Sequence, residues 1–202
     1  RLLYSIDAKP SRTMTTLTPA VQKLIAELDA AVELCDCQSL CNRVKDVLHD
    51  VVADGADVLP AEFLAPTPGK YARRLLHRDP KNRYSVVIMV WGPGQGTPLH
   101  DHCGHWCVEC VYRGQIKVVS YSKQSEDGDR FRFAAEKEVY AGCGDAGALI
   151  PPFEYHTIEN AQEAPAVTIH VYSEELEWCY IFQPTEVAGE FERVRRDLCY
   201  SA

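Results

Sequence analysis

The hydrophobic pattern of the chain changes once, near Pro68, and this change restricts the folds open to it. Before Pro68, apolar residues recur every three or four positions, which is typical of amphipathic helices. After Pro68, the pattern alternates or runs through short β-branched stretches that Gly, Asp and Pro separate. Because no long helices follow that could connect parallel strands, we expect the strands to pair antiparallel. The sequence therefore predicts a mainly β fold, an antiparallel sandwich or barrel with an N-terminal helical segment.

The N-terminal part predicts two amphipathic helices. The first begins after Thr18, which suits an N-cap, with Pro19 at the first helical position. The second follows Ser39, and a short helix fits Pro60–Leu64. The strands are expected at residues 71–77, 84–91, 107–112, 115–121, 131–133, 148–150 and 167–172. Between two of them, Arg113-Gly114 suits a tight hairpin.

A chain of this length can fold around one core, so we expect one domain. Because the first Met is residue 14, residues 1–17 are interpreted as a leader or an irregular N-terminus, and residues 18–202 as the domain. Its helices are expected within about 18–66 and its barrel from about 69.

The charge balance removes two classes of partner. The chain carries 21 Lys and Arg against 29 Asp and Glu, a formal net charge of -8, with no run of basic residues. Such a surface repels phosphate backbones, so we expect no nucleic-acid partner. No apolar stretch approaches about 18 residues, so no membrane helix is predicted.

The nine cysteines are an odd number and fit reduced thiols, so we expect a cytoplasmic protein.

Two histidines separated by one residue give the first indication of chemistry. On an extended strand, His100 and His102 point to the same side, where both can bind one metal ion. A His-x-His pair by itself is equally typical of a solvated strand edge. A third histidine, His156, follows the turn at Pro151–Tyr155 and enters a later strand. The three together favour a metal site.

The spacing around these histidines resembles the two sequence motifs of the cupins, which are antiparallel β-barrels of the jelly-roll type. The motifs are Gly94-(x5)-His100-x-His102-(x4)-Cys107-(x6)-Gly114 and Pro151-(x4)-His156-(x3)-Asn160. Cys107 stands where most cupins have a glutamate ligand, and Phe153 where they usually have glycine. Without that glutamate, three neutral imidazoles would leave a divalent metal with its full charge and open positions, which suits an anionic ligand such as a thiolate.

Three polar residues share one face of the strand predicted at 167–172. Thr168, His170 and Tyr172 alternate there with Val167, Ile169 and Val171. Taken alone, such a face is typical of a solvated surface. In a barrel that holds a metal, the same side chains would form a hydrogen-bonded row that directs a phenol toward the site.

Beyond the cupin motifs, the chain from about Tyr71 to Phe182 resembles the cysteine dioxygenases. The resemblance rests on Tyr71-Ala-Arg73, Trp91-Gly-x-Gly, both histidine motifs and Pro165-Ala-Val-Thr-Ile-His170-Val-Tyr172-Ser173, with Cys179 beyond. It implies that His100, His102 and His156 bind non-haem Fe(II). The donor types alone would not distinguish an iron site from a zinc site. It also implies a thioether crosslink between Cys107 and Tyr172 beside the iron. His170 would orient the tyrosine hydroxyl, with Thr168 extending the row.

Arg73 resembles the arginine that holds the substrate carboxylate in this family, with Tyr71 as its companion on the same strand face. A guanidinium can bind a carboxylate through two charge-assisted hydrogen bonds. Outside this motif, Arg73 beside Arg74 would be interpreted as a surface residue. Relatives that act on 3-mercaptopropionate tend to have Gln and Gly at the places of Arg73 and Cys107, so this pair favours L-cysteine.

The resemblance implies a monomeric enzyme of cysteine catabolism and taurine biosynthesis that uses O2 to oxidise the thiol of L-cysteine to cysteine sulfinic acid. Tyr172, Cys107 and His170 would be its catalytic residues. Two alternatives stay open: a dioxygenase of another small carboxylated thiol such as 3-mercaptopropionate, and a non-enzymatic cupin that holds zinc structurally. His105 is a further candidate ligand, although its spacing from His102 favours a loop.

Overall fold

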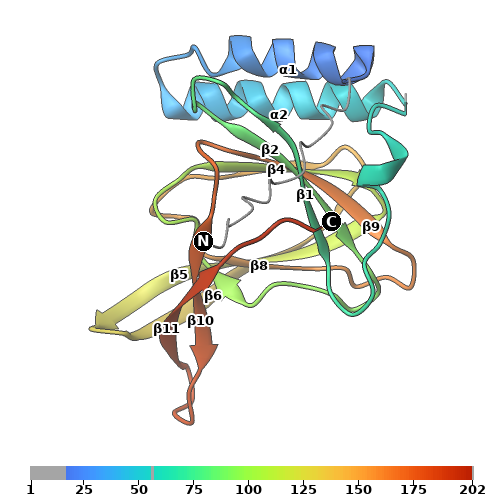
Figure 1. Cartoon of the computed structure of the whole chain (residues 1–202). Coiled ribbons are helices and arrows are strands. Elements are labelled where there is room, and N and C mark those ends of the chain that lie inside the picture. The colour runs from blue at the N-terminus through green and yellow to red at the C-terminus, as the bar shows by residue number, and fades with distance from the viewer. Residues whose placement is uncertain (1–16, 56, 202) are drawn as a thin grey trace, which may run out of the picture.

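The computed structural model describes residues 17–55 and 57–201, so nearly all of the predicted N-terminal leader, including Met14, lies outside the described residues. Two α-helices and one 3-10 helix precede the strands (Figure 1). The helices are α1 (Pro19–Ala31), α2 (Cys37–Ala53) and η1 (Ala61–Phe63). The strands are β1 (Ala72–Arg78), β2 (Ser85–Trp91), β3 (Leu99–His100), β4 (Cys107–Arg113), β5 (Gln115–Asp127), β6 (Arg130–Gly142), β7 (Ala146–Leu149), β8 (His156–Glu159), β9 (Ala166–Tyr172), β10 (Trp178–Pro184) and β11 (Glu190–Asp197).

These strands form two antiparallel sheets. Five strands lie in the order β1-β2-β9-β4-β7, and the other six close into a barrel in the order β10-β11-β6-β5-β8-β3. Helices α1 and α2 lie side by side over the five-stranded sheet (Figure 1). The predicted mainly β fold, an antiparallel barrel with an N-terminal helical segment, is confirmed.

The predicted helix starts are close to those observed. The Thr18 hydroxyl accepts a hydrogen bond from the Val21 amide at 3.2 Å, and Pro19 opens α1, both as predicted. Helix α2 begins earlier than predicted because the Asp36 carboxylate caps it, accepting from the Ser39 amide at 2.7 Å. No helix among the described residues combines the length and apolar character needed to cross a membrane.

The central strands of the five-stranded sheet are buried on both faces. Every residue of β2 and of β9 is buried. Alternate residues pack under the two helices, among them Val86, Ile88, Val167, Ile169 and Val171. The residues between them face the interior between the two sheets. The alternative of a solvated face for Thr168, His170 and Tyr172 is therefore wrong, because all three side chains are buried there.

The hairpin predicted at Arg113-Gly114 is also wrong. Strand β4 pairs with β7 and β9, whereas β5 pairs with β6 and β8, so the chain passes from one sheet to the other at Gly114. Gly114 has a φ of 79°, and a Cβ there would lie 3.1 Å from the Ala166 Cβ. The glycine thus serves a close crossing between sheets.

The sequence pattern predicted too few strands in the second half of the chain and made one of them too short. Strand β6 runs from Arg130 to Gly142 instead of residues 131–133, and β10 and β11 were not predicted. Much of β6 and β11 is exposed and rich in charged residues, which hides the apolar alternation by which strands are found.

Tyr112, near the end of β4, fastens the segment that follows α2 to the sheet. Its side chain is buried, and its hydroxyl accepts hydrogen bonds from the amides of Val58 at 3.1 Å and Leu59 at 3.4 Å. This contact joins residues more than 50 positions apart.

We predict that Tyr112→Phe lowers the free energy of unfolding by about 1–3 kcal/mol, because two buried amides lose their acceptor. Chemical denaturation followed by circular dichroism would measure the change. The exposed Tyr140 provides the matched control, since Tyr140→Phe should change stability by less than about 0.5 kcal/mol. Equal stability of both variants and the parent chain would contradict the anchoring role.

Candidate metal centre

Three histidines meet between the two sheets. His100 on β3 is the register partner of His156 on β8, and their ring centroids lie 4.4 Å apart. His102 lies just beyond β3, which ends at His100, yet its ring is 5.2 Å from that of His100 and 5.1 Å from that of His156. One nitrogen from each ring lies within 4.8 Å of the others. The structure thus brings together the histidines that the sequence singled out.

The hydrogen bonds of these imidazoles leave nitrogen lone pairs at the centre. Nδ1 of His100 lies 3.0 Å from the Pro98 carbonyl, and Nδ1 of His156 lies 2.9 Å from the Glu154 carbonyl. A carbonyl only accepts, so each Nδ1 carries a ring proton, which leaves each Nε2 as the nitrogen available to a metal. Both nitrogens of buried His102 lack a partner. Buried nitrogens without partners are rare, and a divalent cation would satisfy the one that carries the lone pair. The residues present therefore fit a divalent metal.

The electrostatics of the cluster keep two of these rings neutral. Burial, reinforced by the neighbouring His156, lowers the pKa of His100 to about 3 and that of His102 well below its ordinary value. Neutral imidazole is the form that binds metals. For His156, burial lowers the pKa, but the adjacent Glu109 carboxylate outweighs burial and raises it.

Glu109 is a site residue that the sequence analysis missed. It lies on β4 two positions after Cys107, on the same inward face, and it is only 8% exposed. Its Oε1 lies 3.2 Å from Nε2 of His156 and 3.3 Å from Nδ1 of His170. Burial alone would raise the pKa of Glu109, but these two imidazoles hold it well below its ordinary value. The site thus contains an ionised carboxylate, although Cys107 occupies the position at which most cupins have their glutamate.

Cys107 and Tyr172 face each other across neighbouring strands. They are register partners in the pairing of β4 with β9, and both are buried. Burial raises the pKa of the Cys107 thiol and of the Tyr172 phenol well above their ordinary values, so both groups stay protonated. The Tyr172 ring lies 5.6 Å from that of His102, which places the phenol beside the histidine cluster.

A row of hydrogen bonds leads along β9 to Tyr172. The Trp91 indole donates to the Thr168 hydroxyl at 2.9 Å, and this hydroxyl lies 2.7 Å from Nε2 of His170. Nδ1 of His170 lies 3.4 Å from the Tyr172 hydroxyl. Because the indole only donates, the Thr168 hydroxyl is free to donate its own proton to His170. The row expected for the interior of a barrel is therefore formed.

Arg73 is buried near the same cluster. Its Nη2 donates to the Leu176 carbonyl at 2.7 Å, and its Cζ lies 4.6 Å from the centre of the Tyr200 ring. The amide and carbonyl of Arg73 both bond to Ser201, which holds the backbone in place. The described residues include no carboxylate within ion-pair distance of its guanidinium. A buried positive charge of this kind favours an anionic ligand.

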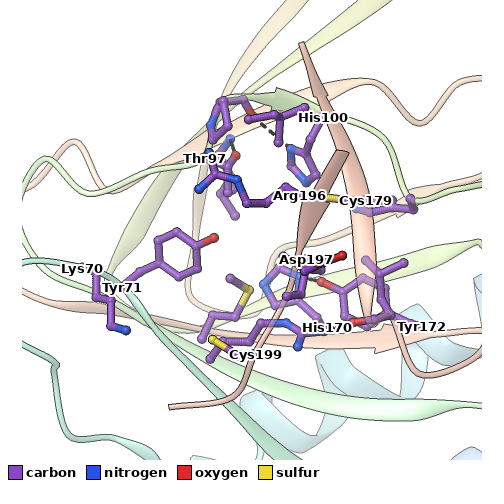
Figure 2. Close-up of a pocket in the computed structure, with 18 of the residues that line it drawn as sticks. Lys70, Tyr71, Thr97, His100, His170, Tyr172, Cys179, Arg196, Asp197 and Cys199 are labelled. Atoms are coloured by element: carbon purple, nitrogen blue, oxygen red, sulfur yellow. Dashed lines mark hydrogen bonds between the residues drawn. The ribbon is translucent and has the colours of Figure 1, made fainter. Parts of the chain in front are cut away.

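One cavity of about 350 Å³ connects these groups (Figure 2). Arg73, His100, His102, Glu109, His170 and Tyr172 line it. The Tyr71 ring lies along the cavity wall, tilted against the Trp91 ring with the two ring centroids 4.7 Å apart, and Lys70 and Arg196 add positive charge. His105 lies apart from the three-histidine cluster, with Nδ1 3.0 Å from the Ser173 hydroxyl. The cavity therefore combines a nitrogen-rich centre with a cationic anchor.

Comparisons with known proteins match this sequence to a known family. Residues 43–185 match the family described as cysteine dioxygenase type I. Cysteine dioxygenase type 1 from Homo sapiens is 25% identical over 118 residues, and that from Danio rerio is 27% identical over 119 residues. The aligned part covers 56% of this chain and 56% of each relative, so the chain spans little more than half of their length.

Two solved structures illustrate the more distant likeness. A protein from Thermus thermophilus is 21% identical, with a TM-score of 0.45 over 59% of this chain and 98% of that chain. An oxalate oxidase in complex with glycolate is 18% identical, with a TM-score of 0.42 over 54% of this chain and 53% of that chain. The family match, in contrast, extends from α2 to the end of β10. The chain therefore belongs to the cysteine dioxygenase type I family.

Proposed function

We propose that this protein is an iron-dependent dioxygenase that converts the thiol of L-cysteine to cysteine sulfinic acid with O2. In this reaction both oxygen atoms of O2 pass to the sulfur, so no external reductant is needed. The proposal assigns Fe(II) to His100, His102 and His156, and the substrate carboxylate to Arg73. The family match supports the reaction class.

One observation carries the proposal: two imidazoles of the cluster, those of His100 and His102, line the same cavity as the Arg73 guanidinium, which has no carboxylate partner among the described residues. A metal-binding protein without a substrate needs the first feature and has no use for the second. A small thiol that also bears a carboxylate matches both, because its sulfur suits the metal and its carboxylate suits Arg73. Cysteamine, which has no carboxylate, would leave the buried charge without a partner.

The chain's own residues would fix the position of the substrate. The Arg73 guanidinium binds the carboxylate through its free N–H groups, while the Leu176 carbonyl and the Tyr200 ring keep it in place. Tyr71, which lies along the cavity wall, is proposed as its companion.

The row that ends at Tyr172 would bring the Tyr172 hydroxyl to the substrate carboxylate, which it would bind together with Arg73. The Tyr172 hydroxyl keeps its proton, because burial raises its pKa, and is positioned as a hydrogen-bond donor. Thr168 and His170 fix the orientation of that hydroxyl. When bound, the ferrous ion would hold the thiolate and supply the electron density that activates O2.

The remaining parts of the proposal concern the cellular setting. All nine cysteines are free thiols, which supports the expectation of a reducing, cytoplasmic compartment. We propose that the protein acts as a monomer in cysteine catabolism toward taurine.

Oxygen uptake by protein loaded anaerobically with Fe(II) tests the reaction. We expect uptake with L-cysteine to exceed that with 3-mercaptopropionate or cysteamine, and mass spectrometry to find cysteine sulfinic acid with two atoms from labelled O2. A preference for 3-mercaptopropionate would replace the substrate but keep the reaction class. No uptake with any thiol would favour a non-enzymatic metal-binding protein.

Arg73→Lys should raise the KM for L-cysteine about 10- to 100-fold, because lysine cannot form the paired hydrogen bonds to a carboxylate. Steady-state kinetics on cysteine and cysteamine would measure this, and only cysteine should be affected. Arg74→Lys is the matched control, because Arg74 bonds to the carbonyls of Phe63 and Ala65 outside the cavity. An equal loss for both substrates would argue against carboxylate binding by Arg73.

Turnover in O2 should join Cys107 to Tyr172, with loss of the thiol hydrogen and one ring hydrogen and with O2 as the oxidant. Peptide mass spectrometry should then find the two segments linked and lighter by two hydrogens. Cys107→Ser should abolish the link, whereas Cys110→Ser, on the face of β4 that packs under the helices, should keep it. Unlinked peptides from the parent chain after extended turnover would refute the crosslink.

A further inference from the structure

We propose that Glu109 is a fourth ligand of the metal ion that His100, His102 and His156 hold, so that the centre consists of three imidazoles and one carboxylate. This inference rests on the proposed function, because it presupposes a metal at the three histidines.

The position of Glu109 on its strand brings its carboxylate to the centre. Glu109 is the register partner of His170 in the pairing of β4 with β9, just as Cys107 is the partner of Tyr172. Its side chain points inward between the two sheets and lines the cavity. An oxygen of Glu109 lies within 4.8 Å of donor atoms of His102 and Cys107, in addition to its contact with His156.

The Glu109 carboxylate lies beside the nitrogen of His156 that would bind the metal. Nδ1 of His156 carries the ring proton, because it faces the Glu154 carbonyl. In the neutral ring, Nε2 then has only a lone pair, and it lies 3.2 Å from the Glu109 carboxylate oxygen. Two lone pairs at that distance repel each other, so either a proton on Nε2 or a metal ion must lie beside both. A metal ion that takes this position on Nε2 would be adjacent to the carboxylate and could bind it as well.

The charge of the centre leads to the same ligand set. Neutral imidazoles leave both positive charges of a divalent ion uncompensated in a buried site, and one carboxylate cancels one of them. Among the described residues, only the imidazoles of His156 and His170 come within ion-pair distance of Glu109. A buried carboxylate without a Lys or Arg partner is stabilised when a metal ion takes that place.

The neighbouring side chains hold Glu109 in a ligating position. Its Oε1 lies 3.3 Å from Nδ1 of His170, whose other nitrogen faces the Thr168 hydroxyl. Carboxylates that bind metals are usually fixed by such outer contacts. The row from Trp91 through Thr168 to His170 therefore ends at two groups, the Tyr172 hydroxyl and the Glu109 carboxylate.

Metal affinity tests the inference without any need for activity. Protein freed of metal would be titrated anaerobically with Fe(II), and separately with Zn(II), against a competing chelator. We expect Glu109→Gln to weaken binding by more than about 100-fold, beyond the loss of about 10- to 100-fold that is typical when a residue only supports a ligand. Glu154→Gln is the matched control, because Glu154 is also buried and close to His156 in sequence, and its affinity should stay within about threefold of the parent chain.

A crystal structure of the Zn(II)-loaded parent chain gives a second test that does not depend on the folding of a variant. It should place a Glu109 oxygen about 2.0–2.2 Å from the metal. A carboxylate more than about 3 Å away, or equal affinities of the Glu109→Gln and Glu154→Gln proteins, would overturn the inference.

His156→Ala separates this inference from the proposed function. If His156→Ala loses the metal while Glu109→Gln retains full affinity, only the role of Glu109 fails. If His156→Ala binds Fe(II) like the parent chain, the three-histidine centre itself fails, and the fourth ligand fails with it.

Discussion

The covering of the five-stranded sheet by α1 and α2 is the constraint on which the site depends. These helices bury one face of β2, β4 and β9, so the alternate residues of each strand must point between the two sheets. A polar residue on that inward face is buried and must find a partner inside. The register of β4 with β9 then fixes the pairs, placing Cys107 against Tyr172 and Glu109 against His170.

Two buried charges of opposite sign line the same cavity without forming an ion pair with each other. Arg73 is held by a carbonyl and an aromatic ring, and Glu109 by two imidazoles. Their separation leaves a cationic position for an anion and an anionic position for a cation, which is how folded proteins reserve polar groups for ligands.

Features encoded locally in the sequence could be predicted. Thr18 and Pro19 mark a helix start through their own backbone chemistry, and the β-branched runs of β2 and β9 were found because burial on both faces makes them continuously apolar. The histidine cluster was accessible because short spacings carry it. His100 and His102 are separated by one residue, and a turn delivers His156 to the neighbouring strand.

Features that depend on which strands meet could not be predicted in the same way. A glycine such as Gly114 permits a tight turn, which suggests a hairpin. The same turn also serves when the next strand crosses to another sheet instead of pairing with the strand before it. The period of two along β4 puts Glu109 on the same face as Cys107, but the spacing of the cupin motif points to position 107 alone. The surroundings of Arg73 come from Leu176, Tyr200 and Ser201, far along the chain.

The pairing of Arg73 with Ser201 also limits when this part of the site can form during synthesis. These residues are 128 positions apart, so this pairing can form only when nearly the whole described chain has emerged from the ribosome. The last of the three histidines is residue 156, which emerges earlier. The nascent chain therefore contains all three imidazoles before the residue that holds the Arg73 backbone in place has been synthesised.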